Sequence, residues 1–269
     1  MKLVLAGGGY AHLLLLRDWH KTQLPAAKLT LVSPFTHLPY SGMLPGCIAG
    51  QYTPDDIMID VQQLCEHAGA KLILDEVCGV DPIQNRVLLS SQKNLNYDLL
   101  SLNTGPAAEI SIPGVAEHAI AVKPISRFLP LWETTCAKLR ATDQVLQLVM
   151  VGGGAGSVET VLAMAQAVIR DAAMRYKPRI TLLCAATRLL PDYPARVAKH
   201  ALQRCQQLGI TVQCGKRVSC VTDSVLEMQA SSKEQIAFDI LFWCAQAAAP
   251  AWLLESGLPC DAAGFLKVT

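Results

Sequence analysis

The sequence has no long hydrophobic run, although 51% of its 269 residues are hydrophobic and its mean hydropathy is +0.30. Apolar stretches such as Leu13 to Leu16 and Ile240 to Trp243 are far shorter than the roughly 20 residues of a membrane-spanning helix. We therefore expect no transmembrane segment. The apolar content instead indicates parallel strands that are buried on both faces.

Neither sign of charge is in excess, because the sequence has 23 basic and 22 acidic residues. This balance, without a basic run, argues against a nucleic-acid partner or docking on an anionic membrane. Met1-Lys2 leads straight into an apolar strand, and the pattern of a signal peptide is missing. The sequence predicts a cytoplasmic protein whose membrane contact is at most peripheral.

A disulfide framework and a metal site are also not expected. The ten cysteines are scattered and contain no CxxC pair. Cys214 and Cys220 are near each other but lack companion His or Cys ligands at zinc spacing. Most of the cysteines are interpreted as buried small hydrophobic residues.

Two glycine triplets each lie between an apolar strand and a helix. Gly7-Gly8-Gly9 follows a strand at 2–6 and precedes a helix at 13–19, with a second strand at 28–32. The unit recurs about 145 residues further on, as a strand at 148–151, Gly152-Gly153-Gly154, a helix at 158–174 and a strand at 179–184. This duplication predicts two nucleotide sites rather than one.

Glycine is needed where a pyrophosphate approaches the backbone at a helix N-terminus. Gly7 and Gly9 fill the first two positions of G-x-G-x-x-G in one loop, and Gly152 and Gly154 fill them in the other. His12 and Ser157 take the third position, where a glycine allows close packing of helix on strand.

The residues after the second strand of each unit usually select the ribose. Here they are Ser33 in the first unit and Cys184-Ala185 in the second, and none is acidic. Ser33 could bond a ribose, and Arg188 could meet a 2′-phosphate or be an ordinary solvated arginine. The choice between NADH and NADPH therefore stays open.

The rest of the chain also contains both helices and strands, separated by loops. The segment 34–52, which contains three prolines, is predicted to be a functional loop without a regular element. Thr104-Gly105-Pro106 indicates a domain exit. Further helices are expected at 55–68, 126–141 and 195–208, and further strands at 71–80, 86–90, 96–102, 210–214, 218–222 and 238–243.

These motifs resemble the pyridine nucleotide-disulfide oxidoreductase superfamily, in which an FAD loop, a Thr-Gly exit such as Tyr97 to Gly105 and an inserted NAD(P) domain follow one another. Val32-Ser33-Pro34 and the stretch His37 to Gly46 resemble type II NADH dehydrogenase-like flavoproteins of the subgroup associated with selenide water dikinase.

The resemblance implies an α/β fold with two Rossmann-like, three-layer dinucleotide-binding domains. Residues 1–110 would form the FAD-binding domain, 111–246 the inserted NAD(P)-binding domain, and 247–269 the return to the FAD domain. Similar proteins continue beyond a segment like Gly264 to Val268 into a strand and a Gly-Asp motif, so the return is expected to be truncated and FAD affinity reduced. Gln246 stands where a Thr-Gly turn is common.

The resemblance also assigns roles. The loop 39–46 would pass the isoalloxazine, and the backbone of Val77 would contact the adenine. Glu159 near the nicotinamide and Lys123 near the flavin are the predicted catalytic residues. The alternative for Glu159 is a carboxylate in the first turn of a helix, where the helix dipole stabilises it. The alternative for Lys123 is an exposed lysine in a linker. The predicted cofactor-binding residues are Gly7, Gly9, Tyr10, Ala11, His12, Ser33, Pro34, Pro45, Val77, Thr104 and Gly105 for FAD, and Gly152, Gly154, Gly156, Ser157 and Glu159 for NAD(P)H.

The function expected from this resemblance is hydride transfer from NAD(P)H to FAD and onward to a quinone-like or other small electron acceptor. The CxxxxC pair of disulfide reductases is missing, and Cys47 alone is interpreted as a packing residue. The alternative is a nucleotide-binding sensor or partner module without turnover, linked to selenium metabolism. Selenide water dikinase and a second copy of the chain are the expected protein partners.

Overall fold

The computed structural model describes residues 1–21, 27–229, 231–245 and 247–268, so the prediction about Gln246 lies outside the described residues. The chain divides into two compact units. Unit 1 comprises Met1–Leu38, Met58–Ala107 and Ala248–Thr269, and unit 2 comprises Pro39–Ile57 and Ala108–Ala247.

Unit 1 is built on a parallel sheet with the strand order β5-β2-β1-β9. Its strands are β1 (Lys2–Ala6), β2 (Lys28–Ser33), β5 (Lys71–Leu74) and β9 (Leu99–Leu102). Helices α1 (Tyr10–Asp18) and α3 (Val61–Ala68) pack on one face through a core that includes Leu5, Leu16 and Leu31.

The other face of this sheet is covered by an antiparallel meander of β6 (Val77–Asp81), β7 (Arg86–Leu89) and β8 (Asn94–Asn96). Val4, Ala6 and Val32 point to this side, where they meet Val87 and Leu89. Successive strand residues therefore enter different cores, which explains the continuous apolar runs in the sequence. The remaining short elements are η1 (Trp19–Lys21), β3 (His37–Pro39), β4 (Met58–Asp60) and α8 (Ala251–Glu255).

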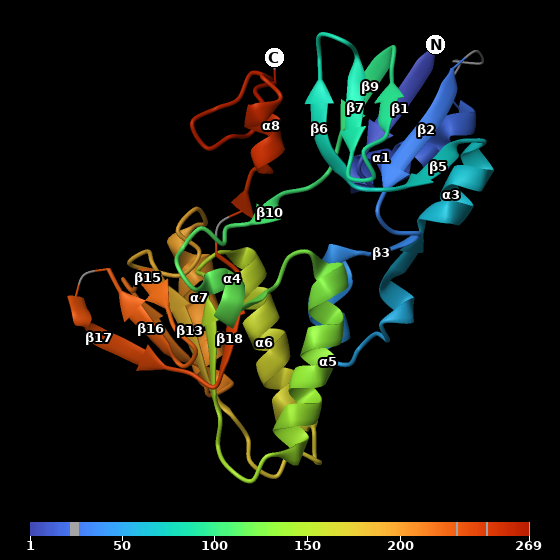
Figure 1. The fold of residues 1–269 in the computed structure, drawn as a ribbon. Helices are drawn as coiled ribbons and strands as arrows, with labels where there is room; N and C mark the ends of the chain where they lie inside the picture. The colour runs from blue at the N-terminus through green and yellow to red at the C-terminus, as the bar shows by residue number, and fades with distance from the viewer. Residues whose placement is uncertain (22–26, 230, 246, 269) are drawn as a thin grey trace. The chain divides into compact units, whose positions relative to one another are not determined.

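Unit 2 contains a parallel sheet with the order β11-β18-β12-β13-β14. Its strands are β11 (Ile120–Ala121), β12 (Gln147–Val151), β13 (Arg179–Cys184), β14 (Thr211–Cys214) and β18 (Ile240–Trp243). One face carries α5 (Ile125–Ala141), α6 (Ala155–Arg170) and α7 (Ala195–Gln207), and the other carries a meander of β15 (Val218–Val221), β16 (Val225–Met228) and β17 (Ser231–Ala237). Figure 1 shows these layers.

The two units repeat one plan. In each, a strand, a glycine triplet and a helix lead to the neighbouring strand and then to the outer one. A three-stranded antiparallel meander follows, and the chain returns as a strand on the other side of the first. The duplication seen in the glycine loops therefore extends over the four strands of the unit 1 sheet and over four of the five strands of the unit 2 sheet, where β11 is an addition at the edge.

Several predicted elements differ from the structure. The segment 34–52 was expected to lack regular structure, yet it contains β3, η2 (Ser41–Met43) and α2 (Leu44–Ile48), because Leu44 and Ile48 are buried in a core. The helix expected at 55–68 begins only at Val61, after η3 (Asp55–Ile57) and β4. The strand expected at 71–80 is divided into β5 and β6, and β16 and β17 were missed.

Residues 39–57 group with unit 2 by their contacts, whereas the prediction placed them in a first domain at 1–110. The reason is visible within unit 2, because α2 lies against α6 and Arg170 donates to the carbonyl oxygen of Ala49 at 3.4 Å. After residues 39–57 the chain passes between the units twice more, within β10 (Ala107–Ala108) and within β19 (Ala247–Ala248). Helix α4 (Val115–His118) follows β10. In the described part of the chain, no helix is long and apolar enough to span a membrane.

Candidate dinucleotide sites

The first glycine loop, Gly7 to Gly9, lies at the carboxyl ends of three parallel strands. The amide of Gly7 donates to the carbonyl of Val32 at 2.9 Å, after β1 and beside the end of β2. The amide of Gly9 donates to the carbonyl of Asn103 at 3.0 Å, just beyond β9. This end of a parallel sheet is where open α/β folds bind their ligands.

Packing requires glycine at both ends of this loop. Gly7 has φ +96°, and a Cβ there would lie 2.4 Å from the carbonyl oxygen of Asn103 and 2.6 Å from the Cα of Thr104. A Cβ on Gly9 would lie 2.0 Å from Oδ1 of Asn103. The predicted Thr104-Gly105 exit is therefore brought directly against the first glycine loop, and Gly105 itself has φ +76°.

His12 fills the third position of the first loop with a buried side chain that is only 2% exposed. Its Nδ1 lies 2.7 Å from the carbonyl oxygen of Gly7, and its Nε2 lies 2.8 Å from Oγ of Ser101 on β9. Burial lowers the pKa of His12, and the Gly7 carbonyl opposes this shift in part. The imidazole is thus occupied inside the protein, so any contact of His12 with a cofactor would have to use its backbone.

The other residues predicted to bind FAD take different places. Ser33 is fully buried at the end of β2, and its hydroxyl donates to the carbonyl of Phe35 at 2.9 Å, so a ribose contact stays a prediction. Val77 is buried at the start of β6, while Pro34 is exposed. Tyr10 and Ala11 form the exposed first turn of α1, and Pro45 belongs to α2 in unit 2.

The second glycine loop, Gly152 to Gly154, is held in an equivalent way. The amide of Gly152 donates to the carbonyl of Leu183 at 2.8 Å, and the carbonyl of Gly153 accepts from the amide of Leu190 at 2.8 Å. Gly152 has φ +145°, and a Cβ there would lie 2.3 Å from the carbonyl oxygen of Cys244. A Cβ on Gly153 would lie 2.1 Å from Sγ of Cys184.

Gly154 differs from its neighbours because no packing contact among the described residues explains its lack of a side chain. Its φ is −83°, and a Cβ there would meet no atom within 4 Å. It is the N-cap of α6, and no side chain caps that helix. Gly9 is likewise the N-cap of α1 without a side-chain cap. Open space at the amino end of a helix suits an anionic group that must approach the backbone closely.

Of the predicted binding residues on α6, one is buried beneath the glycine loop and two are exposed. Ser157 is 1% exposed, and its hydroxyl donates to the carbonyl of Gly154 at 2.8 Å, so it supports the loop. Gly156 is exposed, with Sγ of Cys244 at 3.6 Å from the position of a Cβ. Glu159 is exposed and lies beyond the first turn, which contains no acidic residue. The alternative of a first-turn carboxylate is therefore wrong.

Lys123 is exposed and precedes α5. Burial raises the pKa of the Cys244 thiol to about 11, and the nearby ammonium of Lys123 acts in the opposite direction. Lys123 therefore lies on the same side of unit 2 as the second glycine loop, which Cys244 contacts. No ion pair joins it to Glu159 in the described part of the chain.

Sequence reasoning missed the residues that shape the two loops from the opposite strand. Asn103 fixes the first loop, Ser101 holds His12, and the carbonyl of Cys244 covers Gly152. Asn103 and Cys244 directly follow the strands that close each repeat, β9 and β18. Because Asn103 and Cys244 occupy equivalent positions in the two repeats, the duplication in the sequence could have indicated their role.

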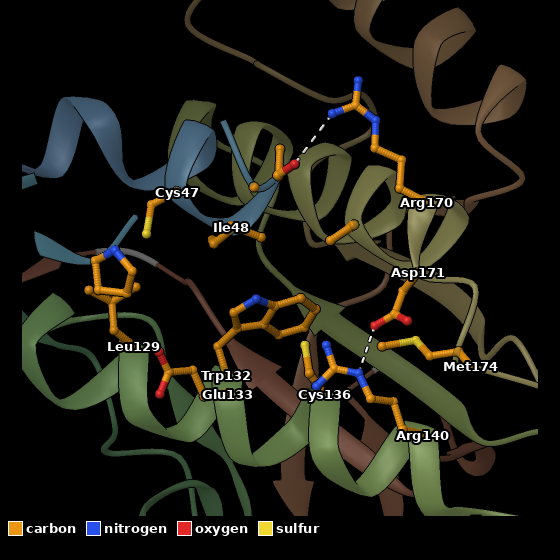
Figure 2. Close-up of a pocket in the computed structure, with 14 residues that line it drawn as sticks. Cys47, Ile48, Leu129, Trp132, Glu133, Cys136, Arg140, Arg170, Asp171 and Met174 are labelled. Atoms are coloured by element: carbon orange, nitrogen blue, oxygen red, sulfur yellow. Dashed lines mark hydrogen bonds and ion pairs between the residues drawn. The ribbon is translucent and has the colours of Figure 1, made fainter. Parts of the chain in front are cut away.

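A separate hollow of about 460 Å³ lies in unit 2 between α2, α5 and the end of α6. Figure 2 shows Cys47 and Cys136 on either side of the Trp132 indole, with Arg140 paired to Asp171 at 2.8 Å. Burial raises the pKa of the Cys47 thiol, and the carboxylates of two neighbouring acidic residues act in the same direction. A raised pKa lowers the thiolate fraction of Cys47, which agrees with the packing role expected from the sequence.

The expectation that most cysteines are buried is wrong. Only Cys65, Cys184 and Cys205 of the ten are fully buried, whereas Cys78 is exposed and the other six are half-buried. Strand ends and helix flanks, where several of them lie, leave part of the thiol accessible. In the described part of the chain, no group of three or more His, Cys, Asp or Glu side chains could hold a metal ion.

The duplicated three-layer plan and its two glycine loops define a chain of two Rossmann-type units. The chain belongs to the pyridine nucleotide-disulphide oxidoreductase family, whose model matches residues 1–269. The α/β fold with parallel sheets is the one expected from the sequence.

The chain is also similar to individual relatives named for NAD(P)H or NADH and to a solved structure. External alternative NAD(P)H-ubiquinone oxidoreductase B2 of Arabidopsis thaliana mitochondria is 23% identical over 271 residues, covering 90% of this chain and 46% of the relative. NADH dehydrogenase-like protein YutJ of Bacillus subtilis is 22% identical, covering 91% of this chain and 64% of the relative. The structure of NDH2 from Plasmodium falciparum in complex with NADH superposes with a TM-score of 0.81 at 18% identity, covering 96% of this chain and 58% of that one. The chain thus spans about half to two thirds of these proteins.

Proposed function

We propose that the chain binds FAD at the first glycine loop and NAD(P)H at the second, and that it passes a hydride from NAD(P)H to the flavin. One observation carries this proposal. Helices α1 and α6 both begin at a glycine without a capping side chain, at the carboxyl end of the first strand of each unit, and four equivalent strands have the same order in both units. Each helix N-terminus is suited to a pyrophosphate.

The residues present fit this assignment. When bound, the flavin would supply the electron-accepting ring, since such chemistry belongs to the cofactor. The protein would contribute the open backbone at Gly154, the rigid loop held by Asn103 and the support of Ser157 beneath the second loop. These contacts pre-form both loops, so that little ordering is needed when a dinucleotide binds.

Glu159 and Lys123 keep their proposed roles near the nicotinamide and the flavin. Both side chains are exposed and belong to unit 2, near the second glycine loop in the case of Lys123. A Glu159→Gln variant is expected to slow flavin reduction by NAD(P)H and to leave the flavin spectrum unchanged. If the rate of flavin reduction does not change, Glu159 has no part in positioning the nicotinamide.

Neither pyridine nucleotide is favoured by the residues that follow β13. Cys184 is followed by two alanines, so no carboxylate there would select a ribose 2′-hydroxyl. The guanidinium of Arg188 donates to the carbonyl oxygens of Leu190, Pro191 and Tyr193 at 3.1, 2.6 and 2.9 Å. Because it is already held by its own loop, Arg188 supplies only a general positive charge, and we propose that both NADH and NADPH are accepted.

A quinone-like or other small oxidant is the proposed electron acceptor. The relative from Arabidopsis is named for ubiquinone, and the absence of a CxxxxC pair argues against a disulfide substrate. The raised pKa of the lone Cys47 thiol supports the same conclusion.

A nucleotide-binding sensor without turnover, working beside selenide water dikinase in selenium metabolism, is the second candidate. The exposure of both proposed catalytic side chains favours it, because catalytic groups usually lie in water-excluded sites. Association with selenide water dikinase or with a second copy would be measured by sedimentation of the mixed and separate proteins. A sensor would bind NAD(P)H without reducing the flavin.

The visible spectrum tests the FAD assignment directly. Protein purified and then reconstituted with FAD should show flavin bands that remain after gel filtration. Loss of all flavin on the column would contradict FAD binding at the first glycine loop, whereas tryptophan fluorescence quenching by NADH would still report on the second loop.

A further inference from the structure

Cys184 and Cys214 are neighbours at the carboxyl edge of the unit 2 sheet. They are the last residues of the adjacent parallel strands β13 and β14 and stand opposite each other in register. Adjacent strands lie about 4.8 Å apart, within the range of about 4.4–6.8 Å that separates Cα atoms in disulfides. Both side chains belong to the core between the sheet and the helices, so they project from the same face.

The two thiols also interact and differ in exposure. Burial is the main reason that the pKa of the Cys184 thiol is raised, and the thiol of Cys214 beside it acts in the same direction. Cys184 is 1% exposed, whereas Cys214 is half-buried. An oxidant in solution would therefore reach Cys214 first, with Cys184 positioned behind it as a second thiol.

The Cys184 thiol lies directly under the second glycine loop. Its Sγ is 2.1 Å from the position that a Cβ of Gly153 would take, and it donates to the carbonyl of Arg188 at 3.3 Å. The carbonyl of Gly153 in turn accepts from the amide of Leu190. The thiol thus supports both the glycine loop and the segment 188–190, and an S–S bond to Cys214 would remove the hydrogen that Cys184 donates to Arg188.

We propose that Cys184 and Cys214 form a reversible disulfide that weakens dinucleotide binding at the second glycine loop. A peroxide oxidises the Cys214 thiol to a sulfenic acid and is itself reduced to water or an alcohol. The Cys184 thiol then attacks that sulfur, the S–S bond forms, and the sulfenic hydroxyl leaves as water. A dithiol reductant restores both thiols through a mixed disulfide.

The disulfide itself does not depend on the proposed function, but its effect on nucleotide binding rests on NAD(P)H being bound at the second loop. The pair is also distinct from a CxxxxC relay, because its cysteines come from two strands 30 residues apart and from the core under a glycine loop.

Peptide mapping tests the bond. The full chain is treated with a small excess of hydrogen peroxide, remaining thiols are alkylated, and the digest is analysed by mass spectrometry. We expect a cross-linked peptide pair containing Cys184 and Cys214, absent after reduction and absent in Cys214→Ser. Cys220→Ser is the matched control, because Cys220 is also half-buried at a strand of unit 2 and should not change the result. Alkylated Cys184 together with over-oxidised Cys214 would overturn the proposal.

Calorimetric titration with NADH and NADPH tests the consequence. Oxidation should weaken binding by about tenfold in the unmodified chain and in Cys220→Ser, and reduction should restore it. Cys214→Ser should bind equally well before and after peroxide. A cross-link without any change in affinity would refute the coupling. If the reduced chain binds neither nucleotide, the proposed function fails, while the peptide map still decides whether the disulfide forms.

Discussion

His12 shows how one side chain can replace a glycine in a dinucleotide loop. The Gly7 carbonyl can only accept, so a neutral imidazole must carry its proton on Nδ1 and accept at Nε2 from the hydroxyl of Ser101. One tautomer therefore links the first glycine loop to β9. The space that a third glycine would leave for helix packing is filled by a bonded ring.

This buried ring predicts a pH dependence of stability. Burial holds the pKa of His12 below its ordinary value of 6.5, so between the two values the unfolded chain binds more protons than the folded one. The free energy of unfolding should therefore fall as the pH drops below about 6.5, by at most about 1.4 kcal/mol per pH unit from this group. Urea unfolding at about pH 7.5 and about pH 5.5 measures this change.

The matched variants are His12→Gln and His200→Gln. His200 is exposed on α7, so its replacement should keep the full pH dependence, whereas replacing His12 should reduce it. Equal pH dependence in both variants would show that His12 does not titrate differently on folding.

Cys47 leads to a second prediction at the residue scale. Because burial and nearby carboxylates raise the pKa of its thiol, little thiolate is present at neutral pH. Cys47→Ser should therefore keep flavin reduction and acceptor reduction within about twofold of the unmodified chain, as expected of a packing residue. Steady-state assays would detect the opposite result, a loss of acceptor turnover with normal flavin reduction, which would assign Cys47 a redox role.

The residue types at the loops could be predicted from sequence, but their partners could not. Gly7, Gly9, Gly152 and Gly154 follow from a local pattern of strand, turn and helix. The contacts of His12 with Ser101 depend on strand pairing between segments 89 residues apart, which no local pattern specifies.

At the scale of elements, the second glycine loop separates a packing requirement from a binding requirement. Gly152→Ala would place a Cβ against the carbonyl of Cys244 at a positive φ, and we expect it to lower the free energy of unfolding by about 2 kcal/mol or more. Gly154→Ala meets open space at an ordinary φ and should change stability by only about 0.5 kcal/mol. Thermal and urea unfolding of both variants measure this difference.

Although Gly154→Ala should change stability little, it should change nucleotide affinity strongly. An added methyl group at the N-cap of α6 would obstruct the backbone that a pyrophosphate approaches, so Gly154→Ala should raise the Kd for NADH by about tenfold. Unchanged NADH affinity in a stable Gly154→Ala protein would mean that the dinucleotide does not approach this loop.

Elements in the parallel sheets were predictable because their apolar runs are continuous. The strand expected at 179–184 agrees with β13, and the helix expected at 195–208 agrees with α7 to one residue. The prediction that segment 34–52 has no regular element was wrong because its prolines obscured the short helix α2. The side chains of Leu44 and Ile48 are buried in a tertiary core and stabilise this helix. Short strands such as β16, which has four residues, are too short to show a clear period in the sequence.

At the scale of the whole molecule, the repeat of sheet, helices and meander was only partly visible in the sequence. The glycine triplets gave its offset, and the family motifs gave the order of the units. The placement of residues 39–57 with unit 2 required the contacts of α2 with α6, which arise only in the folded chain. Four equivalent strands in the same order and a helix that begins at an uncapped glycine in each unit support the proposal that the chain binds two dinucleotides that exchange a hydride.

Anaerobic stopped-flow mixing of the FAD-reconstituted chain with NADH, and separately with NADPH, tests that hydride transfer most directly. We predict bleaching of the flavin bands in a single turnover with either nucleotide, and slower bleaching in Gly154→Ala at a fixed, subsaturating nucleotide concentration. A flavin that stays oxidised while NADH binds would contradict the proposed oxidoreductase and support the sensor instead.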